Sequence, residues 1–426
     1  MIVVFVLGYT AIALENPIKV DKAASALIIG ALGWVLFAFS GVDTNHVLEE
    51  LQHHLVDIAE ILFFLLGAMT IVELIDAHEG FTIITDKITT NKKVFLMWIL
   101  SFITFFFSAA LDNLTTAIVM AALLPKLFKE RTILWMFAGI IILAANAGGA
   151  WSPIGDITTI MLWIGGQVTS VNIISSVFIP SLVCMLVPII FLSIKMKGEV
   201  ERPEHQKGLE HYIDPTTPFE RNLIFFMGVG GLLFVPIFKI VTHLPPYLGM
   251  LLSLGVLWLT TELLHRSKNI EHKSGMTVVG VLKKIDVPTI YFFLGILLAV
   301  ASLQSAGHLN IVAEFLDNKM NGNIYAINIL IGLLSAIVDN VPLVAGAMGM
   351  YPIAETGNFA VDGKFWEFLA YCAGTGGSIL IIGSAAGVAV MGILKVDFIW
   401  YMKKISLLAL LGYFAGAATY IVIQSF

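Results

Sequence analysis

The sequence predicts an all-α polytopic membrane protein built from two inverted-topology repeats. Composition gives the class, because 58% of the 426 residues are hydrophobic and only 13% are charged, which lies outside the range of soluble domains. Long apolar stretches recur along the chain, and those near twenty residues are long enough to cross a bilayer as helices. The repeat is indicated by two copies of one polar motif, Ser108–Asn113 and Ser335–Asn340, each set inside an apolar stretch.

The first repeat is expected over residues 1–195. It opens with a short helix at Ile2–Leu14, which lacks the basic segment and the small-residue cleavage site of a signal peptide. Spans follow at Ala24–Phe39 and Ile58–Ile75. The next two apolar stretches, at about 93–125 and 133–165, are longer than one crossing needs. For these the sequence predicts first a re-entrant hairpin and then a broken helix.

The second repeat is expected over residues 222–426, after a cytoplasmic linker at 196–221. Its first elements are spans at Asn222–Val241, Tyr247–Leu264 and Val287–Leu303. A second re-entrant hairpin at about 323–352 and a second broken helix at about 365–394 come next, and Ile405–Ile423 is the last span. Each half therefore holds six elements in the same order.

The distribution of basic residues predicts the orientation. We place the N-terminus outside and let both Asp-Asn segments return to the side they enter. Of the 24 Lys and Arg residues, all but Lys239, Lys319 and Lys364 then fall in cytoplasmic segments, as the positive-inside rule requires. The bias would collapse if those segments crossed fully. The halves then have opposite orientation, and both termini are expected outside the inner (plasma) membrane of a prokaryote.

Ordered matches between the halves extend the repeat beyond the Asp-Asn motifs. Asp57–Gly67 resembles Asp286–Gly295, and Asn146–Asp156 aligns without gaps on Gly374–Ser384. A carboxylate at membrane depth is costly and is by itself a functional hypothesis. Matching polar interruptions in two halves point to a transporter whose site lies where the repeats meet.

Glycine pairs accompany the polar residues. Gly148-Gly149 and Gly376-Gly377 lie mid-span, where glycine weakens a helix and any freed carbonyl needs a partner. The alternative is that these glycines only permit close packing of helices. Around the first pair gather Asn146, Ser152, Asp156, Thr158 and Thr159. Carboxylate, amide, hydroxyl and carbonyl oxygens are the ligands of a hard cation.

The same motifs carry a family resemblance. The Ser-Ala-x-x-Asp-Asn elements, the segment Asn146–Thr159 and the helix Glu60–Leu74 resemble the NhaD-type sodium/proton antiporters. That family belongs to the ion transporter superfamily, which also contains divalent-anion/sodium symporters and arsenite carriers. The likeness covers nearly the whole chain. It implies a scaffold domain, a transport domain with two re-entrant hairpins, a homodimer and elevator-type movement.

The resemblance also implies which residues bind ions, since hairpin tips and the unwound points of the following helices form the sites in this superfamily. In the first repeat these are Ser108, Asp112, Asn113, Thr115, Thr116, Asn146, Asp156, Thr158 and Thr159, with Na⁺ expected at Asp112, Asn113, Asn146 and Asp156. Their counterparts in the second repeat are Ser335, Asp339, Asn340, Thr375, Ser378 and Ser384. Because Ser384 stands where the first repeat has Asp156, the two halves are not expected to form equivalent sites.

Other polar residues are candidates for proton movement. Glu60 and Glu73 lie on one predicted helix and are candidates for proton relay. For Glu60 the alternative is a pair with a scaffold lysine or a dimer contact, and for Glu73 it is a solvated, funnel-lining role. His53 and His54 are expected in a solvated acidic outer loop, with pH sensing as the alternative.

The predicted function is secondary antiport of Na⁺ or Li⁺ against H⁺, serving pH homeostasis, with carboxylates that bind cation or proton in competition. The alternative on the same fold is a sodium-coupled carrier of a dicarboxylate-like anion or oxyanion, for which hydroxyls, amides and helix N-termini are suitable. An intramembrane aspartyl protease would explain paired aspartates but neither the glycine pairs nor the asparagines. We therefore expect no enzyme activity, no cofactor and no nucleic-acid partner; the expected partners are the ions, the bilayer and a second subunit.

Overall fold

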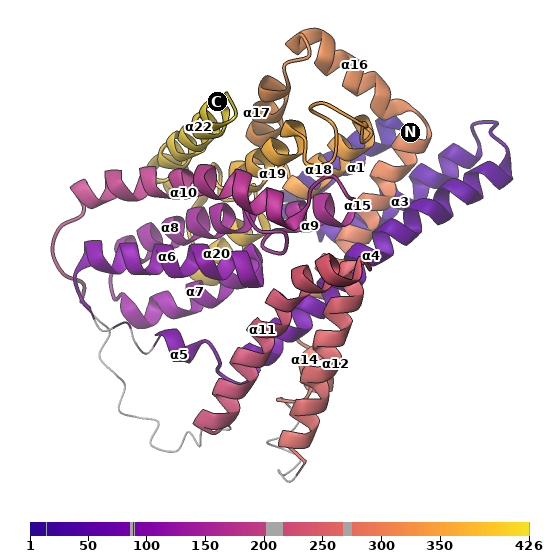
Figure 1. The fold of residues 1–426 in the computed structure, drawn as a ribbon. Coiled ribbons are helices and arrows are strands. Elements are labelled where there is room, and N and C mark those ends of the chain that lie inside the picture. Colours follow the sequence, from indigo (N-terminus) through magenta and orange to yellow (C-terminus); the bar gives the residue numbers. More distant parts are fainter. Residues whose placement is uncertain (14, 86–87, 89, 202–215, 267–274, 426) are drawn as a thin grey trace.

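The fold is described from a computed structural model of residues 1–426, except 14, 86–87, 89, 202–215, 267–274 and 426 (Figure 1). In this part of the chain the regular secondary structure is helical. Eight of the described helices are long and apolar enough to cross a membrane, or nine if the bent pair α20 (Ala385–Leu394) and α21 (Phe398–Lys404) is one span. The chain is thus a polytopic, all-α membrane protein, as the sequence predicts. The predicted linker 196–221 lies partly outside the described residues.

The long apolar helices follow the predicted order, and short helices lie between some of them. In the first half they are α1 (Ile2–Ala13), α2 (Glu15–Ile18), α3 (Lys22–Ala38), α4 (Thr44–Ala77), α5 (Thr82–Thr85), α6 (Lys93–Leu111), α7 (Asn113–Leu127), α8 (Arg131–Ala150), α9 (Ile157–Ile164) and α10 (Ser170–Lys195). The second half holds α11 (Pro218–Thr242), α12 (Pro246–Leu264), α14 (Val278–Leu282), α15 (Val287–Ser305), α16 (His308–Met320), α17 (Ile324–Ser335), α18 (Asn340–Met350), α19 (Lys364–Gly376), α20, α21 and α22 (Ser406–Ile423).

Helix α4 is much longer than the predicted span. It begins at Thr44, so His53 and His54 are helical, and their placement in a loop was wrong. The extension is stabilised by packing, since Val47 is buried against Trp34 and Phe37 of α3. The apolar stretch alone could not predict this contact, because it depends on the neighbouring helix.

Two groups of helices pack among themselves. The first group contains α3, α4, α11, α12 and α15; the second contains α6 to α10 with α17 to α20 and α22. Within the first group, α3 and α15 touch backbone to backbone, because a Cβ on Gly30 would lie 2.5 Å from the carbonyl oxygen of Gly295. In Figure 1, α4, α11 and α12 extend away from the second group.

Helices α6 and α7 form a hairpin with Asp112 at its tip. Both ends of the hairpin lie at one short segment, since the backbone N–H of Lys93 donates to Gly198 O (3.1 Å) and that of Lys129 donates to Glu201 O (3.3 Å). Helices α17 and α18 also pack on each other and meet at Asp339. The chain therefore turns at both Asp-Asn motifs.

Helices α8 and α9 are separated by residues 151–156, and α19 and α20 by residues 377–384. Gly148 and Gly149 lie in the last turn of α8, and the helix ends directly after them, at Ala150. A Cβ on Gly148 would overlap the carbonyl oxygen of Phe105, and one on Gly376 would overlap that of Gly332. These two glycines permit close packing of each broken helix against its hairpin, which is the alternative reading of the pairs.

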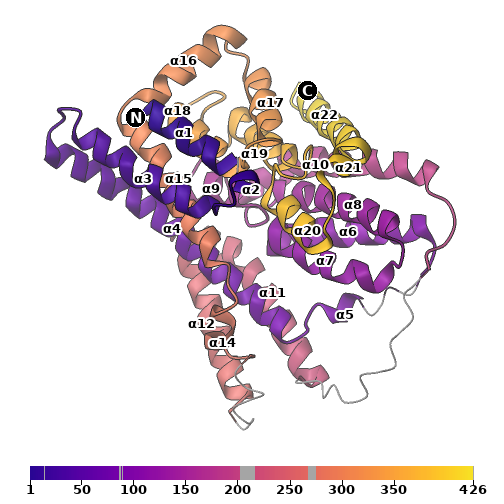
Figure 2. The ribbon, with the colours of Figure 1, turned by 180° about the vertical axis from the view of Figure 1, so that it is seen from behind.

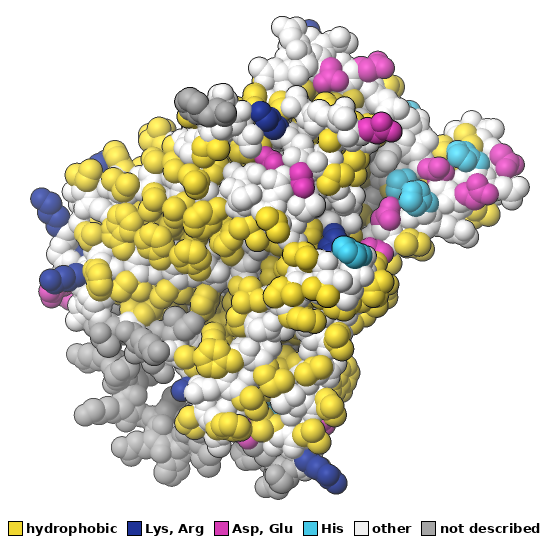
Figure 3. All heavy atoms as spheres, viewed as in Figure 1, with side chains coloured by type: hydrophobic (Ala, Val, Ile, Leu, Met, Phe, Trp, Pro, Cys, Tyr) yellow, Lys and Arg dark blue, Asp and Glu magenta, His cyan; other side chains and the backbone are white. Residues whose placement is uncertain are grey.

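The outer surface is mostly apolar. Figure 3 shows hydrophobic side chains over the middle of the molecule, with acidic and histidine side chains gathered at one end, over the start of α4. Of the candidate spans, α11 and α12 are the least covered by the rest of the chain. In their most apolar 18-residue segments, 28% and 22% of the residues are buried. Their exposed faces need lipid or another subunit against them.

Candidate functional site

Asp156 lies at the N-terminus of the half-helix α9. Its Oδ1 accepts hydrogen bonds from the backbone N–H and the hydroxyl of Thr158, at 2.8 and 2.6 Å. Its Oδ2 accepts one from Asn113 Nδ2 at 2.6 Å. The residue is only 1% exposed. A buried carboxylate must be compensated, and here three donors and the positive end of α9 do so.

Asn146 joins the two halves of the chain. Its Oδ1 accepts from Asn113 Nδ2 at 3.0 Å. Its Nδ2 donates to the hydroxyls of Ser378 and Ser384, at 2.9 Å each. The structure thus gathers predicted residues of both repeats into one buried hydrogen-bonded group. We call it the central cluster: Asn113, Asn146, Asp156, Thr158, Ser378 and Ser384.

The two hairpin-tip aspartates cap the helices that follow them. Asp112 accepts from the backbone N–H and hydroxyl of Thr115, both at 2.8 Å, and has a φ of 98°, which is rare outside glycine. Asp339 accepts from the N–H of Val341 at 3.2 Å. No hydrogen bond is seen from either carboxylate to the central cluster, yet both lie close enough to Asp156 for electrostatic interaction with it.

Ser108 and Ser335 tie each hairpin to the broken helix behind it. The Ser108 hydroxyl donates to Ala145 O at 2.5 Å, and the Ser335 hydroxyl donates to Ala373 O at 2.9 Å. Both hydroxyl protons are thus engaged by backbone. The structure gives these two predicted site residues a positioning contact in matching places.

The remaining predicted residues lie around the cluster. The Thr159 hydroxyl donates across the break to Ala150 O at 3.5 Å, and that of Thr375 donates within α19 to Tyr371 O at 2.6 Å. Asn340 is 5% exposed at the start of α18. The Thr116 hydroxyl is buried and makes no hydrogen bond to any described residue. It is therefore an unused oxygen close in sequence to Asp112 and Asn113.

Glu60 and Glu73 lie outside the central cluster. Glu60 lines a cavity of about 320 Å³ together with Asp57, His53 and Gln167. The Oε1 atom of Glu73 is 3.7 Å from the ammonium of Lys284. An ion pair therefore accounts for the position of Glu73, while Glu60 faces a cavity between α4 and α9.

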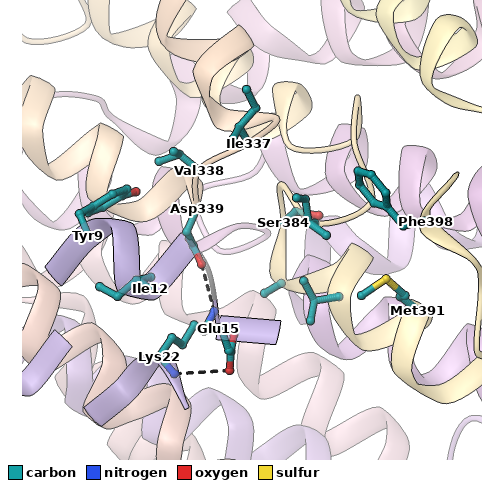
Figure 4. A pocket seen from close by; sticks show the side chains of 13 residues that line it. Tyr9, Ile12, Glu15, Lys22, Ile337, Val338, Asp339, Ser384, Met391 and Phe398 are labelled. Atoms are coloured by element: carbon teal, nitrogen blue, oxygen red, sulfur yellow. Dashed lines mark hydrogen bonds and ion pairs between the residues drawn. The ribbon is translucent and has the colours of Figure 1, made fainter. Parts of the chain in front are cut away.

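A second cavity, of about 490 Å³, reaches the central cluster at Ser384 (Figure 4). Asp339 also lines it, and the ammonium of Lys22 lies 3.1 Å from the Asp339 carboxylate. Figure 4 shows this pair across the cavity from Ser384. Figure 2, which shows the molecule from behind, places α1 and α2 near α20, and all three contribute residues to this cavity.

Sequence reasoning missed Lys22 as a site residue. The residue was counted only as one of the cytoplasmic charges that give the topology. A signal was present, because Lys22 begins a helix, where the positive helix end disfavours a cation. Such a lysine needs an acidic partner, although the sequence does not say which acid supplies it.

The central cluster has the chemistry of a hard-cation site. It offers carboxylate, amide and hydroxyl oxygens, all withdrawn from bulk water. Small hard cations bind such oxygens, and protons compete for the carboxylate. Asp156 acts electrostatically on Asp112, and Asp339 acts on Asp156, so the negative charge in this region favours cations over anions.

Comparisons with known proteins give one family model and several named relatives. The family model described as "Citrate transporter" matches residues 9–367. "Sodium/proton antiporter 1" of Arabidopsis thaliana is 44% identical over all of this chain and 72% of its own length, and "Sodium/proton antiporter 2" of the same plant is 43% identical over the full length of both. "Na(+)/H(+) antiporter NhaD" of Vibrio cholerae is 31% identical over all of this chain and 92% of its own.

These relatives come from a plant as well as from bacteria, so the expected prokaryotic origin finds no support. Their names are those of transporters and not of enzymes. The family model matches most of the chain, and this match together with the identities of the relatives establishes the family. The chain belongs to the citrate transporter family and, within it, to the NhaD-type sodium/proton antiporters.

Proposed function

We propose that the protein exchanges Na⁺ or Li⁺ for H⁺ across the membrane, with carboxylates that bind cation or proton in competition. The observation that carries this proposal is the Asp156 carboxylate, buried in a cluster to which both halves of the chain contribute. The names of the relatives support the same ions. No cofactor is required, because the bound species are themselves the cargo.

Competition follows from the crowding of acids. The negative charge of Asp156 acts on Asp112, and that of Asp339 acts on Asp156. A state in which all three carboxylates are ionised and no cation is bound is therefore unfavourable. Either a metal cation or a proton relieves this repulsion, and each uses the same oxygens. Loading one ion therefore releases the other. An exchanger needs only this exclusion and access from alternate sides.

Alternate access is proposed to come from an elevator-type movement of the second helix group against the first. Both cavities lie between the groups. One is lined by α1 to α3 facing the Asp339 tip and α20, and the other by α4 and α15 facing α9 and α18. Displacement of the second group would open one cavity while it closes the other. The paired packing of α7 on α20 and of α9 on α18 supports the inverted repeat.

A homodimer is proposed to cover the sparsely buried faces of α11 and α12. Large hydrophobic side chains such as Phe226, Ile237 and Leu259 are exposed there. Light scattering of the purified protein in detergent, corrected for bound detergent, would give the oligomeric state. A monomer at all concentrations would contradict this part of the proposal.

The alternative is sodium-coupled anion transport, and it is favoured by the description of the matching family model. An anion would have to enter a cluster that contains Asp156 and has Asp112 and Asp339 nearby. Each uncompensated carboxylate would repel it. Cations bound at those acids could offset the repulsion, so the experiment must include anions.

The test uses everted vesicles with a preformed proton gradient and a pH-sensitive dye. Addition of NaCl or LiCl is expected to dissipate the gradient, whereas KCl and sodium-free citrate are not. Asp156→Asn should remove the Na⁺ response, which controls for leak. The apparent KM for Na⁺ should rise as pH falls, since protons occupy the same oxygens. Dissipation only when sodium and citrate are both present would favour the anion carrier instead.

A further inference from the structure

We propose that the side chain of Lys22 takes the place of a bound cation at Asp339, the aspartate at the tip of the second hairpin. We call Asp339 and the residues of the second repeat around it the second half-site, and Asp112 and Asp156 with their neighbours the first. Its ammonium holds the carboxylate of Asp339 in the present conformation and excludes the transported cation from it. When the hairpin moves, Lys22 stays behind and Asp339 takes up a cation or a proton in its place. This inference rests on the proposed antiport and identifies a residue that would set its apparent affinity.

The ion pair joins distant parts of the chain. Lys22 Nζ lies 3.1 Å from Asp339 Oδ2, and the two residues are 317 positions apart. The ammonium also lies 4.3 Å from the ring centroid of Phe292 on α15. Lys22 is the first residue of α3, where the helix dipole disfavours a positive charge. The stability of α3 therefore does not explain the lysine, whereas the carboxylate and the ring do.

The two partners belong to different helix groups. Lys22 is fixed to α15 through the close backbone contact of Gly30 with Gly295. Asp339 lies at the tip of α17 and α18, beside the central cluster. Any displacement of one group against the other separates the pair. The side chain of Asp339 is partly buried, with 14% of it exposed, and a carboxylate in such a place is less stable without a positive partner. We therefore expect another cation or a proton to bind Asp339 once Lys22 has left.

The cavity around the pair offers what a replacing cation needs. The hydroxyls of Tyr9 and Ser384 border it together with Asp339 (Figure 4). The Tyr9 hydroxyl has no hydrogen-bond partner among the described residues. Glu15 lines the cavity as well, and its Oε1 accepts from the backbone N–H of Lys22 at 3.4 Å. Carboxylates together with neutral hydroxyl oxygens are a suitable set for a small hard cation. The first hairpin differs, because the carboxylate of Asp112 is bonded by Thr115 and by no lysine that the structure describes.

The decisive variant is Lys22→Gln, studied by Na⁺-driven dissipation of the proton gradient at fixed pH. Removing the competing ammonium is expected to lower the apparent KM for Na⁺ about tenfold, which corresponds to about 1.4 kcal/mol. Lys22→Arg keeps the charge and is expected to keep the KM close to that of the wild type. Lys364→Gln is a matched control, since Lys364 bonds the carbonyl of Gln424 far from the cavity; its KM should not change.

A second measurement does not depend on transport. Binding of ²²Na⁺ to the purified, monodisperse protein should tighten in Lys22→Gln, and this gain should disappear when Asp339→Asn is added. The double variant thereby tests whether the effect passes through Asp339. It also covers the case in which Lys22→Gln reduces the amount of folded protein, because binding is scaled to the protein present.

Three outcomes would overturn the inference. The KM for Na⁺ could stay constant while the maximal rate falls, which is what a purely structural ion pair predicts. Lys22→Arg could behave like Lys22→Gln, so that charge is irrelevant. The gain in binding could persist without Asp339. Failure of the proposed function is distinct, because the wild-type protein would then show no Na⁺-driven proton movement at all.

Discussion

The two half-sites share a framework but differ in charge. In both, a serine of the hairpin bonds a carbonyl of the broken helix, at Ala145 or at Ala373. In both, a glycine near the break lies against the hairpin backbone: a Cβ on Gly155 would be 2.7 Å from Ser108 O, and one on Gly383 would be 2.6 Å from Ser335 O. The two hairpins thus make matching backbone contacts, although the side chains around them differ.

Three differences bear directly on charge and ion ligands. Asp156 corresponds to Ser384, Asn146 corresponds to Gly374, and among the described residues a lysine pairs with the second aspartate tip and not with the first. Gly374 leaves room for the first half-site, because a Cβ there would lie 3.0 Å from the Cβ of Ala150 and 3.9 Å from Asp156 Oδ2. The second half thus contributes the hydroxyls of Ser378 and Ser384 to the central cluster, and Gly374 leaves room beside Asp156. The comparison favours one composite site over two equivalent ones.

The largest difference between the two half-sites is expected when the matching residues Asp156 and Ser384 are each substituted. Asp156→Asn keeps size and hydrogen-bonding capacity but removes the charge, and it is expected to abolish Na⁺-driven proton movement. Ser384→Ala removes one neutral oxygen that accepts from Asn146, so we expect a milder rise in KM with measurable transport. Dye-based assays in everted vesicles, scaled to protein content, measure both. Equal and complete loss in the two variants would mean that the second half-site is as essential as the first.

Asn146 should come next in effect, because its amide bonds one residue of the first half and two of the second. Asn146→Ala removes its contacts with Asn113, Ser378 and Ser384. Hydrogen bonds in a charged network are worth about 1.5–3 kcal/mol, so the KM for Na⁺ should rise by roughly ten- to a hundredfold. Ser378→Ala leaves Ser384 as an acceptor and should cost less. If Asn146→Ala and Ser378→Ala raised the KM equally, the amide would not be the bridge that the structure describes.

Much of the fold could be predicted from the sequence because membrane helices are specified locally. The apolar stretches, the polar interruptions and the positions of the aspartates are properties of short segments. Helix ends were predicted within a few residues for α12 and α15. The extension of α4 was not, since Val47 is held by Trp34 and Phe37 from another helix. Contacts of that kind override the local pattern.

The central cluster shows the same limit. Its members could be named from the resemblance and the repeat, but their arrangement could not. The bonds from Asn146 to Ser378 and Ser384 join residues 232 and 238 positions apart. The pairing of Lys22 with Asp339 could not be predicted for the same reason, because the two residues are 317 positions apart. An alignment of the two halves relates Asn146 to Gly374, whereas in the structure Asn146 bonds Ser378 and Ser384.

A smaller effect is expected where the frameworks of the two halves coincide. Gly148→Ala and Gly376→Ala would each press a methyl group against a hairpin carbonyl. Overpacking of this kind costs about 1–3 kcal/mol, so both variants should have lower melting temperatures in detergent. Gly230→Ala is the matched control, since a Cβ on this residue of α11 meets nothing within 4 Å. A loss in only one of the first two would show that the matched backbone contacts are not equally important.

The hairpin tips give the finest test of the comparison, through the labelling rates of single cysteines. Leu114 lines a cavity with Lys22 and Asp286, whereas Val341 is 2% exposed. In a background without Cys184 and Cys372, which are both buried, Leu114→Cys should react with an impermeant thiol reagent from the cytoplasmic face. Val341→Cys should react slowly, and only from the external face. Na⁺ should change the two rates in opposite directions if it shifts the inward and outward populations. Irregular backbone at membrane depth must border protein or water, so tips that never become accessible, or that react equally with and without Na⁺, would contradict re-entrant hairpins that alternate between the two sides.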